Sequence, residues 1–406
     1  MPSKVLDLDL ADDPGDVPGL GAYDRAFVLL RWRGLPIGSV WLDVIDGRLP
    51  AADLWQAAHA RHGRAITHAM AADALPCPAE PPLDDVSLPS ATVAVCTKDR
   101  PDDLRRCLAA LCALTPPAHE ILVVDNAPSD ERTASVCRDF PVRYVREDVK
   151  GLNWARTRAA REARGEVIAY TDDDATPDRR WLEALLVPFR HPAVAAVTGL
   201  VLPLELETDG QELFEQYCGF SRGFRQRVFD ARRISPLGAA NVGAGASMAI
   251  RRQLVNDLGL FRVELDAGTA AQSGGDTFAF YRLLSLGHRI VYTPAAIAWH
   301  RHRQSPRDLV QVLRSYSVGT YVFLLRCLLF HGETGAIQVG FGWFLGHHVR
   351  QLLRRAIGRA NAQPFGLTLA EIQGVLMSPW ALWKTLRRER SILRGNATAA
   401  LPATEA

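Results

Sequence analysis

The sequence predicts an α/β fold in which a mainly parallel sheet is flanked by helices. Between residues 91 and 201, short apolar runs of strand length alternate with segments of helical periodicity. Several of these runs end directly in acidic residues. Such alternation is typical of layered α/β folds with a parallel sheet. The composition, 48% hydrophobic and 23% charged, is that of an ordinary globular protein.

The elements of this layer can be assigned in order along the chain. The predicted strands span residues 92–96, 120–125, 142–145 and 166–170. The predicted helices span residues 102–114, 129–139, 153–164 and 178–190. After residue 201 the pattern is irregular, with Gly-rich segments at 238–246 and 265–275, until the apolar strand IVYTPAAIAW before His300.

These patterns divide the chain into five parts. Residues 1–75 are expected to form a small α+β unit of unassigned role, with an acidic tail over 1–20, two strands within 25–45 and a helix over 51–61. The Pro-rich residues 76–90 are typical of a linker. The α/β domain is expected over 91–307, a helical C-terminal region over 308–395 and a flexible tail over 396–406.

Charge and cysteine usage exclude several classes of protein. The 47 Lys and Arg against 45 Asp and Glu leave a net charge of +2, whereas a dedicated nucleic-acid binder usually has a large basic excess. The seven cysteines show neither CxxC pairs nor zinc-finger spacing. The acidic N-terminus does not resemble a signal peptide, and Arg326 interrupts the apolar run YVFLLRCLLF. We therefore expect a cytoplasmic protein that binds no nucleic acid.

Acidic and basic side chains follow the predicted strands at their carboxyl ends. Residues 97–100 (TKDR) follow the first strand, Asp125 ends the second, and residues 172–174 (DDD) follow the fourth. Ligands bind at this edge of parallel sheets. Three adjacent carboxylates repel one another unless a cation compensates, and Mg²⁺-type sites combine one or two carboxylates with substrate phosphates. The alternative is a solvated turn.

A phosphate-binding glycine loop is missing after every predicted strand, so the charge of a diphosphate must be met by the metal and by basic side chains. Arg156, in the helix that precedes the fourth strand, is a candidate, although it can equally be an exposed helix arginine. Asp276 follows two glycines at the start of a helical pattern, where a carboxylate is favoured by the helix dipole or acts as a simple cap.

These segments resemble the family 2 glycosyltransferases, which have a GT-A (Rossmann-like) fold. The resemblance covers residues 92–302, about half of the chain. It rests on VAVCTKDRPDDLRRCLAAL, LVVDNAPSD, GLNWARTRAAREARGEVIAYTDDDATPDRRWLEAL, FEQYCGFSRGF, GAGASMAIRR, LDAGT and SGGDTFAFYRLLSLGHRIVYTPAAIAWHRHR, in this order.

The resemblance implies a role for each matching residue. Asp276 takes the place of the catalytic base. Asp174 and His300 take the place of metal ligands, for Mn²⁺ or Mg²⁺, and His302 follows two residues later. The residues implied in binding the nucleotide sugar are Thr97, Asp99, Arg100, Asp125, Arg156, Asp172 and Asp173.

The sequence departs from the family pattern at three places. Lys98 and Asp99 replace a Tyr-Asn pair, which puts base recognition in doubt. Gly275 replaces the Glu that usually precedes the base, which puts acceptor positioning in doubt. Gln311 and Arg314 are followed by Ser315 rather than by the Trp of processive members, which argues for the addition of one sugar.

The resemblance thus implies an inverting, metal-dependent glycosyltransferase (hexosyltransferase type, EC 2.4) that moves one sugar from a nucleoside-diphosphate sugar to a hydroxyl of a glycan, a lipid-linked or a small-molecule acceptor. Cell-surface glycan, glycolipid or specialised-metabolite synthesis are the settings it implies. Two alternatives remain: a non-catalytic nucleotide-sugar binding protein of the same fold, and a phosphatase of the haloacid-dehalogenase type, whose motif fits residues 172–176 but normally follows the first strand.

The C-terminal helical region is basic and carries Trp380 and Trp383 among its charges. A basic helix with interleaved aromatic residues is typical of peripheral contact with an anionic membrane, here the cytoplasmic face of the inner membrane. A helix that packs its apolar face against the body of the protein has the same pattern. Both interpretations are open at this stage.

Overall fold

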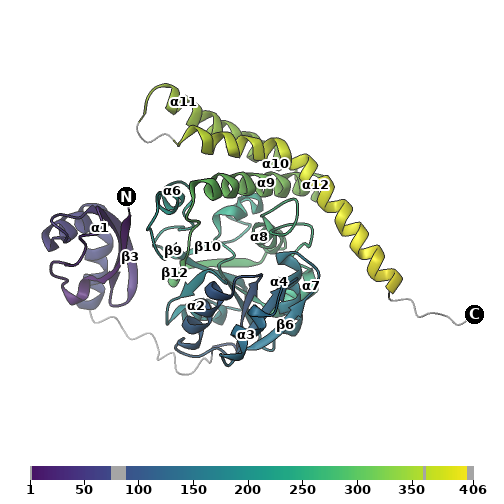
Figure 1. The fold of residues 1–406 in the computed structure, drawn as a ribbon, viewed down its shortest axis with the longest axis horizontal. Helices are drawn as coiled ribbons and strands as arrows, with labels where there is room; N and C mark the ends of the chain where they lie inside the picture. Colours follow the sequence, from purple (N-terminus) through teal and green to yellow (C-terminus); the bar gives the residue numbers. More distant parts are fainter. Residues whose placement is uncertain (1, 75–87, 360–362, 400–406) are drawn as a thin grey trace, which may run out of the picture.

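The computed structural model describes residues 2–74, 88–359 and 363–399 (Figure 1). Along the chain it has an N-terminal α+β unit, a central α/β body and a set of C-terminal helices. Most of the predicted linker, 76–90, lies outside the described residues. The predicted tail at 396–406 begins too early, because the last helix continues to Ala399. The remaining residues of that tail are not described.

The body contains the expected mainly parallel sheet. Its strand order is β10-β12-β9-β11-β7-β4-β5-β6, and β8 pairs with β12. The four strands predicted from the sequence are present and mutually parallel: β4 (Ala91–Thr97), β5 (Glu120–Asn126), β6 (Arg143–Glu147) and β7 (Val167–Asp172).

Four further strands of this sheet were not predicted, and two of them, β11 and β9, lie directly beyond β7. β9 (Val194–Pro203) is buried at every residue, so it shows none of the alternation that marks a half-exposed strand. β11 (Ser247–Arg251) runs antiparallel between β7 and β9. The other strands here are β8 (Ala175–Pro177), β10 (Arg227–Phe229) and the predicted β12 (Arg289–His300), which is parallel to β9.

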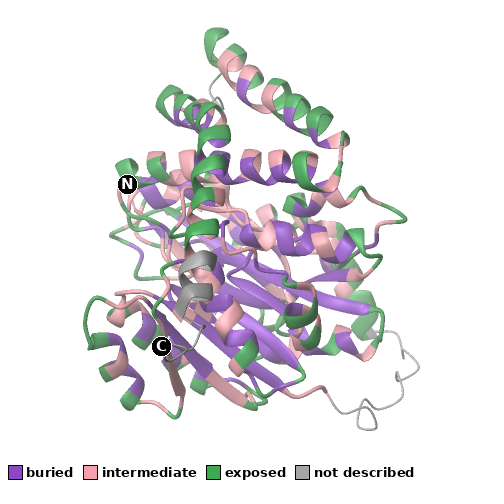
Figure 2. Cartoon of the chain, turned by 90° about the vertical axis from the view of Figure 1, so that its right-hand side faces the viewer, coloured by how far each residue is buried: buried purple, intermediate pink, exposed green. Residues whose placement is uncertain are grey.

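Helices cover both faces of this sheet. The helices of the body are α2 (Pro101–Cys112), α3 (Arg132–Arg138), α4 (Leu152–Glu162), α5 (Trp181–Leu186), α6 (Asp209–Cys218), α7 (Arg252–Leu258) and α8 (Gly275–Ser285). Successive residues of β4 point to opposite faces, so Val93 and Val95 join the core beneath α2, whereas Ala94 joins the core that contains Ala155 of α4. Figure 2 shows the buried strands in purple.

The N-terminal unit has one more strand than the sequence predicted. β1 (Ser3–Asp9) pairs in parallel with β2 (Arg25–Trp32), which pairs with β3 (Leu35–Asp43), and α1 (Ala51–Ala74) packs on this sheet. Residues 1–20 were expected to form an acidic tail, and this prediction is wrong for Ser3–Asp9, which form β1. Its leucines pack against the apolar core of the unit, while the acidic residues between them remain accessible to solvent.

The C-terminal helices form a layer beside the body (Figure 1). They are α9 (Pro306–His331), α10 (Gly335–Trp343), the π-helix η5 (Phe344–Val349), α11 (Arg350–Ala356) and α12 (Phe365–Ala399). By length and hydropathy, α9 is the one described helix that could cross a membrane, although half of its most apolar window is buried inside the protein. No membrane-spanning segment was expected here from the sequence, because Arg326 interrupts the apolar run.

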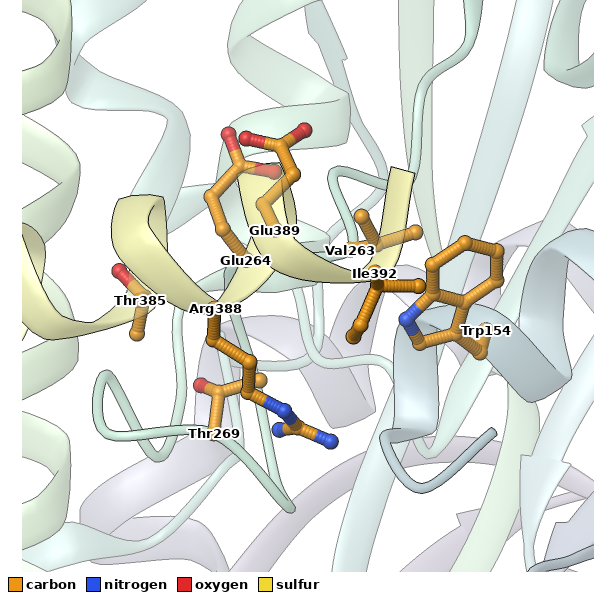
Figure 3. Close-up of a pocket in the computed structure, with 8 residues that line it drawn as sticks. All are labelled: Trp154, Val263, Glu264, Thr269, Thr385, Arg388, Glu389 and Ile392. Carbon is orange, nitrogen blue, oxygen red and sulfur yellow. The ribbon is translucent and has the colours of Figure 1, made fainter. Parts of the chain in front are cut away.

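The second half of α12 crosses a loop of the body. The guanidinium of Arg388 donates hydrogen bonds to the carbonyl oxygens of Gly268 and Lys150, both at 2.6 Å. Figure 3 shows the small pocket at this crossing, where the side chain of Arg388 of α12 lies beside Thr269 and that of Ile392 lies beside Trp154 of α4. α12 therefore ties the 265–275 loop to the start of α4, and this loop contributes to the site described next.

Candidate active site

A large open cavity of about 1060 Å³ lies at the carboxyl ends of β4, β5 and β7. The segments 240–246 and 266–277 and the first half of α9 complete its walls. Of the ten side chains predicted from the sequence, all but Asp125 line this cavity. Those that do are Thr97, Asp99, Arg100, Arg156, Asp172, Asp173, Asp174, Asp276 and His300.

Asp172, Asp174 and His300 converge in one part of the cavity. β7 ends at Asp172, and the chain reverses into the short strand β8, which pairs with β12 so that His300 lies opposite Ala175. One possible ligand atom from each of these three side chains lies within 4.8 Å of the other two. His300 Nε2 is 3.2 Å from Asp174 Oδ1. The pairing of two distant strands thus assembles a donor set of two carboxylates and one imidazole.

The three adjacent carboxyl groups have different electrostatic surroundings. Burial alone would raise the pKa of Asp174, but the neighbouring His300 and Arg100 outweigh it and lower that pKa. Burial raises the pKa of Asp172, and the charge of Asp174 adds to this increase. Burial and the charge of Asp174 likewise raise the pKa of Asp173 to about 7. A cation at this position would relieve the repulsion that these carboxyl groups experience.

Asp173 is held by the end of β4. Thr97 donates a hydrogen bond from Oγ1 to Asp173 Oδ2 at 2.7 Å. Arg100 reaches both Asp173 Oδ1, at 3.1 Å, and Asp174 Oδ2, at 2.9 Å. Because Thr97 and Asp173 are buried, these contacts fix the turn after β7 against the turn after β4.

A second histidine and a glutamate support His300. His300 Nδ1 is 3.2 Å from His302 Nδ1, and His302 Nε2 is 3.1 Å from Glu215 Oε2. Burial and the charge of His300 keep the pKa of His302 well below its usual value. With Nδ1 of His300 facing His302, the Nε2 of His300 is directed at Asp174. Glu215 was not identified from the sequence, because it lies far from His300 along the chain.

Arg156 is buried at the centre of a group of carboxylates. Its Nη1 donates to Asp266 Oδ2 at 2.7 Å, and its Nη2 lies 4.0 Å from Asp172 Oδ1. The guanidinium also lies over the ring of Phe261. The alternative of an exposed helix arginine is excluded, since only 4% of Arg156 is accessible. Asp266 lies in the LDAGT motif, but nothing in that motif indicated its pairing with Arg156.

Asp276 lies in the first turn of α8, as expected. The N-cap is Gly274, with φ of 92°, so Asp276 is not the cap residue. Its Oδ2 accepts a hydrogen bond from Gly245 N–H at 2.8 Å, and its Oδ1 accepts one from Thr277 N–H at 2.7 Å. Both carboxylate oxygens are thereby oriented, and the side chain lines the cavity.

Gly275 has no room for a side chain. A Cβ at this position would lie 2.3 Å from Asp266 Oδ2 and 2.5 Å from Asn153 Nδ2. Asp266 therefore occupies the space into which a larger residue at 275 would project. Where the family pattern has a Glu, this chain has Gly275, and the carboxylate of Asp266 from the preceding loop fills the space beside it.

Gly275→Ala should destabilise the fold by about 1–3 kcal/mol, the usual cost of overpacking a filled interior. The added methyl group would displace Asp266 from Arg156. Urea unfolding of the parent protein and of Gly275→Ala would measure the loss in the free energy of unfolding. Gly238→Ala is the matched control, since a Cβ at Gly238 would meet open space. Equal unfolding midpoints for Gly275→Ala and the parent would contradict this packing.

Asp125 and Asp99 differ in their surroundings. Asp125 is fully buried, its Oδ2 accepts from the hydroxyl of Tyr144 at 2.9 Å, and burial raises its pKa to about 6. Asn126, the next residue, lines the cavity instead. Asp99 lies in the cavity wall, where hydrogen bonds from Lys98 and Ser129 lower its pKa.

Comparison with known proteins identifies the family. The model of the family described as "Glycosyl transferase family 2" matches residues 92–259. A glucosyl-dolichyl phosphate glucuronosyltransferase of Haloferax volcanii is 31% identical over 227 residues, which are 52% of this chain and 68% of that protein. The chain belongs to glycosyl transferase family 2.

Other proteins named as glycosyltransferases are similar to this chain. The pre-mycofactocin glycosyltransferase of Mycobacterium tuberculosis is 27% identical over 270 residues, covering 65% of this chain and 52% of that relative's length, so the chain spans about half of it. The structure of the mannosyltransferase PcManGT from Pyrobaculum calidifontis, in complex with GDP-Man and Mn²⁺, matches 73% of this chain and 90% of its own, with a TM-score of 0.50 and 17% identity. This likeness supports the GT-A fold.

Proposed function

We propose that the protein is a metal-dependent, inverting glycosyltransferase that moves one sugar from a nucleoside-diphosphate sugar to an acceptor hydroxyl. The observation that carries this proposal is the single cavity that contains the Asp172, Asp174 and His300 donor set together with Asp276. Relatives named as glycosyltransferases, and a neighbour described with GDP-Man and Mn²⁺, support it.

The donor set fits a divalent metal. Two carboxylates and one imidazole are compatible with Mn²⁺, and the carboxylates also with Mg²⁺. Asp172, Asp174 and His300 would hold the ion, and the Glu215–His302 pair would keep the Nε2 of His300 directed toward it. When bound, the ion supplies Lewis-acid stabilisation of the leaving diphosphate. Arg100 and Arg303, which line the same part of the cavity, add positive charge there.

Asp276 is the proposed general base. The two backbone N–H groups that bind its oxygens orient the carboxylate for proton transfer. It removes the proton from the acceptor hydroxyl as the acceptor oxygen bonds to the anomeric carbon. The bond from that carbon to the diphosphate oxygen breaks on the opposite face, so the configuration inverts. Arg156, buried beside Asp276 and Asp172, balances the charge of these carboxylates.

The C-terminal helices support a lipid-linked acceptor. Together α10, α11 and α12 expose large apolar side chains, including Phe341 (64% accessible), Leu353 (61%) and Leu376 (75%); Figure 2 shows exposed residues in green along these helices. On α12, Lys384 lies over the ring of Trp380 and Arg387 over the ring of Trp383. Exposed apolar and basic groups of this kind fit an anionic membrane surface. Contact with the cytoplasmic face of the inner membrane would bring a lipid-linked acceptor near the cavity.

This membrane contact is tested with sedimentation of vesicles that contain phosphatidylglycerol. We expect the protein to sediment with them and the double variant Trp380→Ser, Trp383→Ser to partition about tenfold less, a change of about 1.4 kcal/mol. Leu35→Ser is the control, because Leu35 is also exposed but lies in the N-terminal unit. Equal sedimentation of the double variant, or no sedimentation of the parent, would exclude the contact.

The transferase proposal is tested by thermal shift with UDP-, GDP- and dTDP-sugars in the presence of Mn²⁺, Mg²⁺ or EDTA. A ligand that binds the native state raises its stability as its concentration exceeds the Kd. We expect one nucleotide sugar to stabilise the protein, and EDTA to reduce the effect. Turnover of that donor with a polyprenyl-phosphate-linked acceptor would then define the reaction. If none of the donors shifts the transition, the proposal fails.

A further inference from the structure

A second cluster of metal-ligating side chains lies in the C-terminal helices. The π-helix η5 presents two consecutive histidines, His347 and His348, and the first turns of α12 present Glu371. His347 Nε2 is 3.2 Å from Glu371 Oε2, and His348 Nδ1 is 3.5 Å from the same oxygen. One atom from each side chain lies within 4.8 Å of the other two. These separations between the ligand atoms of the three side chains are close to those between ligands of a single bound metal ion.

The two histidines are consecutive residues of a π-helical turn. On a regular α-helix, consecutive side chains point about 100° apart around the axis. π-helical turns are rare, and they occur frequently at functional sites. Here the two imidazole rings lie 5.0 Å apart between centroids. Both rings contact the same carboxylate, that of Glu371.

His348 is buried without a hydrogen-bond partner. Only 1% of it is accessible, and neither Nδ1 nor Nε2 has a partner among the described residues. A buried polar group without a partner costs free energy, and in a native structure such a group often marks an ion or a water. The distance from Nδ1 to Glu371 is too long for a good hydrogen bond. An ion between the three side chains would give the ring nitrogen a partner.

The surroundings favour a closed site. The ring of Trp343 stacks on His348, and those of Phe344 and Tyr321 lie near it. Ser317 of α9 donates to the backbone oxygen of Glu371 at 2.7 Å, which fixes α12 at this point. Two neutral imidazoles and one carboxylate suit a borderline transition metal such as Zn²⁺ rather than Mg²⁺.

We infer that His347, His348 and Glu371 form a zinc-type site, with water in the remaining position. The site is independent of the Asp172, Asp174 and His300 set, which has two carboxylates and only one imidazole. Its ligands come from η5 and α12, so a bound ion would join the two segments. Trp343, which stacks on His348, also lines the large cavity. The ion would therefore stabilise one wall of that cavity and take no part in the reaction.

The test uses the full chain, purified without a polyhistidine tag and stripped with EDTA. Zn²⁺ alone is then added, and bound zinc is measured after gel filtration. Asp174→Ala serves as the background, since it removes a ligand of the other donor set. We expect Asp174→Ala to retain one zinc and the double variant Asp174→Ala, His348→Gln to lose it. Retention of zinc by the double variant, or no zinc in Asp174→Ala, would overturn the inference.

Further variants guard against a folding defect. Asp174→Ala, His119→Gln removes an exposed histidine and should keep the zinc. Asp174→Ala, Glu371→Gln should lose it, as the His348 variant does. In the single Asp174→Ala protein, Co²⁺ should give the intense visible bands of a four- or five-coordinate ion. The weak bands of an octahedral ion would contradict the site, and this result would not depend on substituting any of its three ligands.

Discussion

Asp276→Asn should lower kcat by about 10²–10⁴-fold, the usual contribution of a positioned general base. The amide keeps the shape of the carboxylate, and its oxygen can still accept the hydrogen bond from Gly245 or Thr277. It cannot take the proton of the acceptor hydroxyl. The binding of the donor, measured by calorimetry, should therefore change little while the rate falls.

Asp257→Asn is the control for this experiment, because it removes the same charge from an exposed position on α7. It should leave kcat unchanged. If Asp276→Asn retains the parent rate, Asp276 is not the base. If the parent protein binds the donor but shows no turnover with any acceptor, the alternative of a non-catalytic nucleotide-sugar binding protein gains support.

Asp174→Ala should abolish most of the metal-dependent activity. The carboxylate of Asp174 is in contact with His300 and Arg100, which lower its pKa despite its burial, so it is charged at neutral pH. The loss of a ligand worth several kcal/mol in transition-state stabilisation corresponds to about a 10²-fold or greater loss in kcat/KM. The dependence of the rate on Mn²⁺ concentration would measure it.

Two outcomes of this second experiment are informative. An increase in the Mn²⁺ concentration needed for half-maximal rate would support Asp174 as a ligand. An unchanged Mn²⁺ dependence in Asp174→Ala would remove Asp174 from the donor set. Asp178→Ala is a suitable control, since Asp178 follows the same turn but pairs with Arg31 of the N-terminal unit.

The sequence was sufficient to predict the α/β layer and the edge of the sheet where ligands bind. The four parallel strands were predicted because each is a short apolar run bounded by polar residues, and their order brings their carboxyl ends to one edge. Residues 97–100 and 172–174 were identified as site residues for that reason. The strand β9 was not predicted, although it is an apolar run that is as continuously buried as β4 and β7.

Only the tertiary structure decided which side chains meet across long separations in the chain. Glu215 supports His302, and Asp266 pairs with Arg156 in the space that Gly275 leaves open. The cluster of His347, His348 and Glu371 likewise joins residues of two separate helices, η5 and α12. The sequence by itself determined local periodicity, strand ends and motif spacing, since these depend on neighbouring residues. Partners from distant elements are set by packing, which local patterns do not encode.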